Sequence, residues 1–138
     1  MMRTKGPIAL DTNIISYWLR GLYNLEKKLE IEFDRENSIV IPPITYYEIL
    51  RGLYFVDSKN KLRYFELLCN RLGKDNMEKA DWIKTAELYA RCRKSGQTME
   101  ESDLLLAGFY LRHNYILVTH NTEHFSHIAD LDLEDWIK

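Results

Sequence analysis

The sequence predicts an α/β fold of three layers, in which a short and mainly parallel central sheet is flanked by helices. Three compact apolar runs have the length of buried strands, and between them apolar residues recur at the helical spacing of three and four positions. Strands that alternate with helices need crossover connections, which give parallel strand pairs with helices on the sheet faces. The length of 138 residues suits one domain with its own core, so a single domain over residues 1–138 is expected.

The N-terminal half is expected to alternate strand and helix twice. Because proline is tolerated in the first turn of a helix but not in its interior, Pro42 and Pro43 mark the start of the second main helix. The expected elements are a strand at 8–10, a helix at 14–19, a charged amphipathic stretch at 22–33, a strand at 38–41 and a helix at 44–53.

The C-terminal half is expected to be mostly helical before it returns to the sheet. Residues 57–60 and 73–76 are polar and predict breaks between helices, and Ser95-Gly96 is typical of a helix C-terminus. The expected elements are an apolar helical stripe at 62–72, helices at 79–93 and 98–113, a strand at 115–118 and an edge strand at 131–133.

The charge balance excludes a protein that binds nucleic acid through a global basic field. There are 19 basic and 21 acidic side chains, for a net charge of −2, so any contact with a polyanion must be local. The candidates for a local basic rim are Arg3, Lys5, Arg20, Arg51, Lys94 and Arg112.

Two cysteines without C-x-x-C spacing, Cys69 and Cys92, favour neither a disulfide framework nor a cysteine zinc site. The N-terminal residues carry too few apolar side chains for a signal-peptide core or a membrane span. A reducing cytoplasm is therefore the expected location.

Acidic side chains occur where the predicted strands end and the predicted helices begin. Asp11 directly follows the first strand, and Glu48 and Asp103 lie in the opening turns of two helices. Because ligands of open parallel sheets bind beyond the carboxyl ends of the strands, these acids are expected to meet at one edge. Carboxylate oxygens are the ligands that a hard divalent cation such as Mg²⁺ prefers.

Each acid also has a purely structural interpretation. Asp11 can cap the following helix, and Asp103 can stabilise a helix N-terminus through the helix dipole. Glu48 and Glu101 each complete a T-x-x-E capping box, with Thr45 and Thr98 as the capping residues.

The polar segment after the third strand is a further candidate for substrate positioning. Thr119, His120, Asn121 and Thr122 offer hydroxyl, imidazole and amide groups that can order water or a phosphate, although Asn121 or Thr122 can also cap a short helix. The spacing of His120, His124 and His127 leaves a zinc site as an alternative.

Four of these motifs, taken in order, closely resemble the PIN-domain signature, and the chain end resembles that of VapC-type toxins. Any one motif is common by chance, whereas four in family order and spacing are specific. The segments are Leu10-Asp11-Thr12-Asn13, Ile44 to Gly52, Gly96 to Ala107, Val118 to Phe125, and for the ending Leu131 to Trp136.

This resemblance implies a three-layer PIN-like fold and a metal-dependent endoribonuclease, the toxin of a type II toxin–antitoxin pair. It implies that Asp11 and Asp103 bind Mg²⁺ or Mn²⁺ and that Glu48 and Glu101 complete the acidic cluster. Thr12, Asn13, Thr119 and Asn121 would position the substrate, and Asn121 stands where many relatives have an aspartate, which argues against a second tightly bound cation. The implied partners are RNA, a cognate antitoxin and a second copy of the chain.

Three other functions were compared with this one. A receiver-like signalling module requires an aspartate ending a middle strand and a lysine ending a late strand, and the sequence supplies neither. A catalytically silent PIN-like binding module and a nuclease for RNA processing or structured DNA both remain compatible with the motifs.

Overall fold

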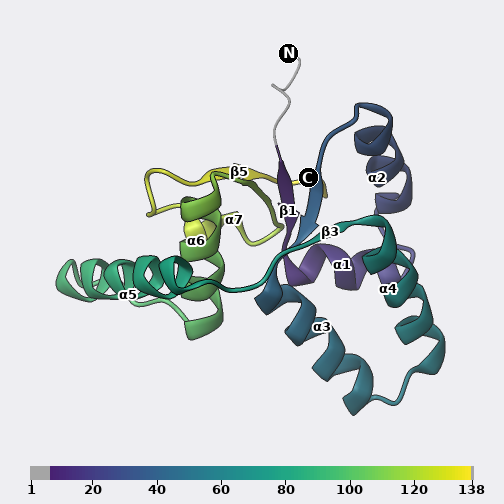
Figure 1. Ribbon diagram of the computed structural model, residues 1–138, viewed down its shortest axis with the longest axis horizontal. Coiled ribbons are helices and arrows are strands. Elements are labelled where there is room, and N and C mark those ends of the chain that lie inside the picture. The colour runs from purple at the N-terminus through teal and green to yellow at the C-terminus, as the bar shows by residue number, and fades with distance from the viewer. Residues whose placement is uncertain (1–6, 138) are drawn as a thin grey trace.

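The computed structural model describes residues 7–137, apart from the side chain of Lys74, and shows a five-stranded sheet between two groups of helices (Figure 1). The strands are β1 (Ile8–Leu10), β2 (Ile39–Ile41), β3 (Gly73–Lys74), β4 (Ile116–Val118) and β5 (Asp132–Glu134). The helices are α1 (Thr12–Leu19), α2 (Leu25–Asp34), α3 (Pro43–Phe55), α4 (Lys59–Arg71), α5 (Lys79–Lys94), α6 (Glu101–His113) and α7 (Thr122–Phe125). None of these helices is both long and apolar enough to cross a membrane.

The sheet confirms the predicted α/β class. Its order is β3-β2-β1-β4-β5, and every neighbouring pair is parallel. Ile8 of β1 pairs with Ile39 on one side and with Ile116 on the other. The chain leaves β1 toward β2 and later returns to the opposite side of β1 with β4, so a topological switch point lies between β1 and β4. Side chains that follow these two strands therefore border the crevice where such sheets bind ligands.

The side chains of β1 alternate between two separate hydrophobic cores. Ile8 and Leu10 pack with α1 to α4, whereas Ala9 packs with α5 to α7. Figure 1 shows the same division, with α1 to α4 on one side of the sheet and α5 and α6 on the other. All three residues are buried, as a period-two strand between two helical layers requires.

Helices α5 and α6 pack unusually closely where Gly108 meets Thr85. A Cβ atom at Gly108 would lie 3.0 Å from the Cα of Thr85 and still nearer to its hydroxyl. A larger residue would have to push the two helices apart, because backbone atoms cannot move aside as a flexible side chain can. The position of α6, and of every side chain that it carries, is therefore set by α5.

Several expected boundaries differ from the structure, each for a local reason. Strand β3 lies where a turn was expected, since two residues that pair only through their backbone leave no apolar pattern. Helix α6 begins at Glu101 and not at Thr98, because residues 97–100 connect it to the end of α5. Residues 23 and 24 have positive φ values, which delays the start of α2 to Leu25.

Neither T-x-x-E motif forms a capping box. Helix α3 is capped at Pro42 and begins at Pro43, so Thr45 and Glu48 lie inside it. Glu100 caps α6 without a side-chain hydrogen bond, which leaves Thr98 outside the helix. The structural interpretation of Glu48 and Glu101 is therefore wrong. A capping box occurs instead at the start of α5, between Glu78 and Asp81.

Candidate active site

Asp11 lies at the switch point, directly after β1. Its backbone N–H donates to the carbonyl of Val118 at 2.9 Å, which fixes it beside the end of β4. It also caps α1, since its Oδ1 accepts the N–H of Thr12 at 2.7 Å. Only 5% of the residue is exposed. The capping interpretation is therefore correct, and the cap uses one of the two carboxylate oxygens.

Thr119 holds this second oxygen from the neighbouring strand. Its hydroxyl donates to Oδ2 of Asp11 at 2.8 Å and accepts the backbone N–H of Asn121 at 3.0 Å. The side-chain amide of Asn13 lies 3.4 Å from both Asp11 Oδ2 and the Thr119 hydroxyl, and its carbonyl accepts the N–H of His120 at 3.2 Å. Thr119 thus fixes the carboxylate of Asp11, although the two residues lie 108 positions apart in the sequence.

Thr12 connects Glu48 to the same edge of the sheet. Its hydroxyl donates to Oε1 of Glu48 at 2.6 Å, which joins the start of α1 to the opening turns of α3. The guanidinium of Arg51 lies 3.6 Å from Oε2, one turn further along α3. The side chain of Glu48 is 15% exposed and so is oriented by neighbours on both of its oxygens.

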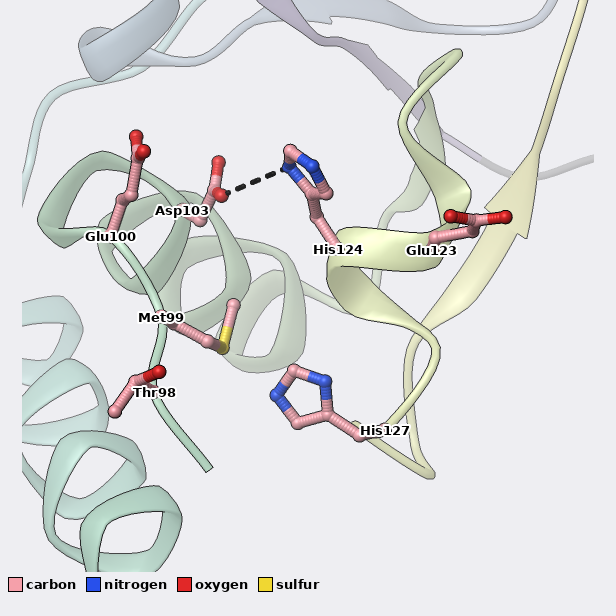
Figure 2. A pocket seen from close by; sticks show the side chains of 7 residues that line it. All are labelled: Thr98, Met99, Glu100, Asp103, Glu123, His124 and His127. Atoms are coloured by element: carbon pink, nitrogen blue, oxygen red, sulfur yellow. Dashed lines mark ion pairs between the residues drawn. The ribbon is translucent and has the colours of Figure 1, made fainter. Parts of the chain in front are cut away.

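Asp103 comes from the opposite layer, in the first turn of α6. Its Oδ2 lies 3.4 Å from Nδ1 of His124 on α7, and 20% of its side chain is exposed. Figure 2 shows His124 directed toward Asp103 across the space between α6 and α7. Asp103 therefore lies on the side of α6 that faces α7.

The three carboxylates act on one another electrostatically. Burial raises the pKa of Asp11, and the charges of Asp103 and Glu48 raise it further, against the hydrogen bonds from Thr119 and Thr12 that lower it. Burial also raises the pKa of Asp103, where Glu100 and Glu48 act in the same direction and His124 opposes them. Acids that repel one another in this way are stabilised by a cation among them.

Two neighbours of Asp103 were not predicted from the sequence. Glu100, and not the predicted Glu101, joins Glu48 in raising the pKa of Asp103. Glu101 is exposed, and within residues 7–137 no hydrogen bond or ion pair connects it to the other acids. His124 lies 21 positions from Asp103 on another helix, so no local pattern could have indicated the pair.

The remaining polar side chains of the loop after β4 lie at the margin of the site. Asn121 is exposed and precedes α7 without a side-chain capping bond. His120 pairs with Asp135 at 3.1 Å, whereas His124 pairs with Asp103. In the described part of the chain, His120, His124 and His127 belong to no group of three close potential ligand atoms, so the structure does not support the alternative of a zinc site.

Among the described residues, the only three potential ligand atoms within 4.8 Å of one another belong to Glu78, Asp81 and His113. The guanidinium of Arg112 already occupies this cluster, with Nε 2.5 Å from Asp81 and Nη2 2.6 Å from Glu78. Burial acts to raise the pKa of Asp81, but the hydrogen bonds from Arg112 and from the N–H of Glu78 lower it overall. We interpret this cluster as an ion-pair network that joins α5 to α6, not as a metal site.

The donor set of Asp11, Glu48 and Asp103 fits a hard divalent cation that retains water. Their ligand atoms do not all lie within 4.8 Å, so direct binding by all three is not indicated. Mg²⁺ is usually bound by one or two carboxylates together with several waters, which requires no closer approach.

The sequence profile of the PIN domain matches residues 8–131 and so spans all three acids. The chain belongs to the PIN domain family. Among related PIN proteins, Ribonuclease VapC1 of Haemophilus influenzae is 28% identical over 130 residues, covering 94% of this chain and 97% of the relative. Ribonuclease VapC2 of Rickettsia felis is 28% identical over 134 residues, covering 94% and 97%.

Solved structures agree with this placement of the PIN domain. The chain matches VapBC2 of Rickettsia felis, solved bound to a DNA fragment from their promoter, with a TM-score of 0.86 and 26% identity. That match covers 94% of this chain and 98% of the other. The predicted PIN-like fold is therefore confirmed.

Proposed function

We propose that this PIN domain, taken as one unit over residues 1–138, is a metal-dependent endoribonuclease that hydrolyses RNA phosphodiester bonds. The observation that carries the proposal is the proximity of Asp11, Glu48 and Asp103, which come from three different elements. Thr12, next to Asp11, donates a hydrogen bond to Glu48, and the charge of Glu48 raises the pKa of both Asp11 and Asp103. The relatives at 28% identity are named ribonucleases, which supports the same chemistry here.

The proposed ligands of the cation, Mg²⁺ or Mn²⁺, are Asp11 and Asp103, with Glu48 completing the charge of the site. Such a cation, when bound, lowers the pKa of a water molecule and stabilises charge that develops on the phosphate. The chain itself supplies orientation. Thr119 and Asn13 hold Asp11, and Thr12 holds Glu48, so both carboxylates are fixed before substrate arrives. The roles of Glu101 in the acidic cluster and of Asn121 in substrate positioning stay predictions. Both side chains are exposed, so a substrate can approach them.

RNA must be held locally, because the net charge of −2 gives no long-range attraction. Arg20 and Lys94 are exposed, and Arg51 lies beside Glu48 at the site. Arg112 is not proposed as an RNA contact, because it already forms ion pairs with Glu78 and Asp81. The other candidates, Arg3 and Lys5, lie outside the described residues. Tyr46 is exposed on α3 and offers a ring for an unpaired base.

We further propose that the protein is the toxin of a toxin–antitoxin pair and forms a homodimer. A toxin–antitoxin complex is one of its structural neighbours at 26% identity. Large apolar side chains are exposed on α3, α4 and α5, and Phe55 is 90% exposed, which favours contacts with protein partners. Sedimentation of a monomer at micromolar concentration would count against the dimer. The two free, buried cysteines suit a reducing cytoplasm.

Removal of divalent metal is expected to abolish cleavage of a mixed RNA pool. Without a cation the three carboxylates repel the phosphate, and Arg51, which already pairs with Glu48, cannot activate a water molecule as a metal ion does. Gel analysis should show intact RNA in excess EDTA and restored cleavage after Mn²⁺ or Mg²⁺ is added back. Cleavage that continues in EDTA would overturn the proposal, and so would the absence of Mn²⁺ binding to the wild type by calorimetry.

Acid is expected to weaken Mn²⁺ binding, beginning at a higher pH than an ordinary carboxylate would require. The pKa values of Asp11 and Asp103 are both raised, first by burial, so these groups take up protons earlier as the pH falls. Since the cation needs the deprotonated form, the Kd should rise by roughly up to tenfold per pH unit for each proton displaced. Calorimetric titrations from about pH 7 to about pH 5 would measure this, and a constant Kd would contradict it.

A further inference from the structure

Three aromatic rings gather beside the acidic site, where α1 ends. The ring of Tyr17 lies in the middle, and the rings of Tyr23 and His120 stand nearly perpendicular to it, with centroids 5.1 and 6.3 Å away. We call Tyr17, Tyr23 and His120 the aromatic track. They come from α1, from the turn between α1 and α2, and from the loop after β4, so the fold brings them together.

The aromatic track begins next to the carboxylate of Asp11. The backbone N–H of His120 donates to the side-chain carbonyl of Asn13 at 3.2 Å, and the amide nitrogen of Asn13 lies 3.4 Å from Oδ2 of Asp11. Tyr17 follows Asn13 by one turn of α1, which is roughly 6 Å along the helix axis. Because stacked nucleotides of one strand are about 3.4 Å apart, the track starts within about two nucleotides of a phosphate bound beside Asp11.

Packing of the core explains the position of Tyr17 but not that of the other two rings. Tyr17 is partly buried against the core that α1 to α4 share. Tyr23 is 51% exposed, although its φ of 59° lies in the left-handed region that is costly for a bulky residue. The side chain of His120 is 44% exposed, and Asp135 holds its ring at 3.1 Å. Rings that are held in place but stay open to solvent indicate a binding surface.

The charges along α1 suit an anionic strand. From residue 12 to residue 25 the only charged side chain is Arg20, in a chain whose net charge is −2. Arg20 is exposed, and its guanidinium carbon lies 6.0 Å from the centre of the Tyr17 ring. The margin of the site between α6 and α7 is instead lined by Glu100, Asp103 and Glu123, which repel phosphate. A polyanion that reaches the acidic site is therefore expected to extend over α1 and not over α7.

We propose that the aromatic track binds unpaired nucleotides of RNA on one side of the scissile phosphate, with their bases stacked on Tyr17, Tyr23 and His120 and a backbone phosphate bound by Arg20. The inference rests on the proposed ribonuclease function for the position of the cut, and it deepens that function by naming how the substrate is held. Every base has a face that can stack, whereas bases inside a double helix are already stacked on one another. The track therefore selects unpaired RNA without reading its sequence.

The affinity for a short single-stranded RNA tests the track, measured by fluorescence anisotropy in EDTA so that the RNA stays intact. Tyr23→Ala should weaken binding roughly fivefold or more, the loss of one stacked base, whereas Tyr23→Phe keeps the ring and should retain the affinity. The matched control is Tyr89→Ala on α5, on the other side of the sheet from α1 (Figure 1). Tyr89 is 44% exposed and also has an arginine over its ring, Arg93 at 5.5 Å. This control should bind RNA as the wild type does.

Two further measurements separate stacking from charge. An abasic strand of the same length keeps its phosphates but has no bases, so Tyr23→Ala and the wild type should bind it equally well. A weaker binding of this strand by Tyr23→Ala would show that the ring does not act by stacking, and would overturn the proposal. Arg20→Gln should instead make the dependence of log Kd on log salt less steep by roughly 0.7, the value for one phosphate contact on a single strand.

The outcomes separate this inference from the function on which it rests. If the wild type, Tyr23→Ala and His120→Ala bind the single strand equally, the track is wrong even when the wild type cleaves RNA. If binding depends on these rings but the wild type leaves RNA intact with Mn²⁺ present, the ribonuclease proposal fails and the track stands as an RNA-binding surface. Should Tyr23→Ala not fold, as judged by circular dichroism, His120→Ala decides by the same comparison of the two strands.

Discussion

Asp103→Asn is expected to lose nearly all metal-dependent cleavage while it remains folded. The substitution keeps the shape of the side chain, but a neutral amide binds a divalent cation less strongly than a carboxylate does. The loss should exceed the roughly 10–100-fold that follows from removing an outer partner of a metal site. Turnover of a labelled RNA at saturating Mn²⁺ would measure it.

A melting curve in EDTA separates this loss from unfolding. The pKa of Asp103 is raised in the folded protein, first by burial, so its ionised form opposes folding. The stability that such a group contributes is complete below its unfolded pKa and is lost as the pH rises through its folded pKa. At neutral pH the variant should therefore melt at the same temperature as the wild type or above it.

The matched control for Asp103→Asn is Asp34→Asn, the same change at an exposed position at the end of α2. This control should keep both activity and Mn²⁺ affinity. Full activity of Asp103→Asn would end the assignment of Asp103 as a ligand.

The second large effect is expected for Thr119→Val, which removes a hydroxyl but nearly keeps the volume. This hydroxyl lowers the pKa of Asp11, fixes its Oδ2 and accepts the N–H of Asn121. Without it, Asp11 should hold its proton more tightly and lose its orientation. We expect a loss of roughly 10–100-fold in Mn²⁺ affinity or in cleavage rate.

Thr45→Val provides the control for Thr119→Val. Thr45 is also fully buried and lies three positions before Glu48, but its hydroxyl has no hydrogen-bond partner within residues 7–137. Removing this group should change neither metal affinity nor rate. Equal effects of the two substitutions would show that Thr119 acts through packing and not through its bond to Asp11.

The sequence predicted most of the architecture because strands and helices leave local patterns. The apolar runs predicted β1, β2 and β4. Because ligands of parallel sheets bind beyond the strand ends, these strands in turn predicted that Asp11, Glu48 and Asp103 lie at one edge. Strand β3 left no pattern, because a two-residue strand between helices pairs only through its backbone.

The errors and omissions concern partners that are distant in sequence. The ion pair of Asp103 with His124 and the network of Arg112 with Asp81 and Glu78 join residues 21 to 34 positions apart. Their chemistry was visible, but their proximity depends on how α5, α6 and α7 pack. For this reason the sequence suggested Arg112 as an RNA-binding residue, although Glu78 and Asp81 already neutralise its charge in the folded protein.

Asp103 and Arg112 stand near opposite ends of one helix, roughly 14 Å apart at the helical rise of 1.5 Å per residue. Arg112 ties one end of α6 to α5, and the glycine contact with Thr85 clamps its middle. Helix α6 is thus fixed to α5 at its C-terminal end and at its middle, while Asp103 lies near its N-terminal end. A disturbance at these ion pairs is therefore expected to move Asp103 at the other end of α6 and to change its distance from Asp11 and Glu48, the proposed site residues.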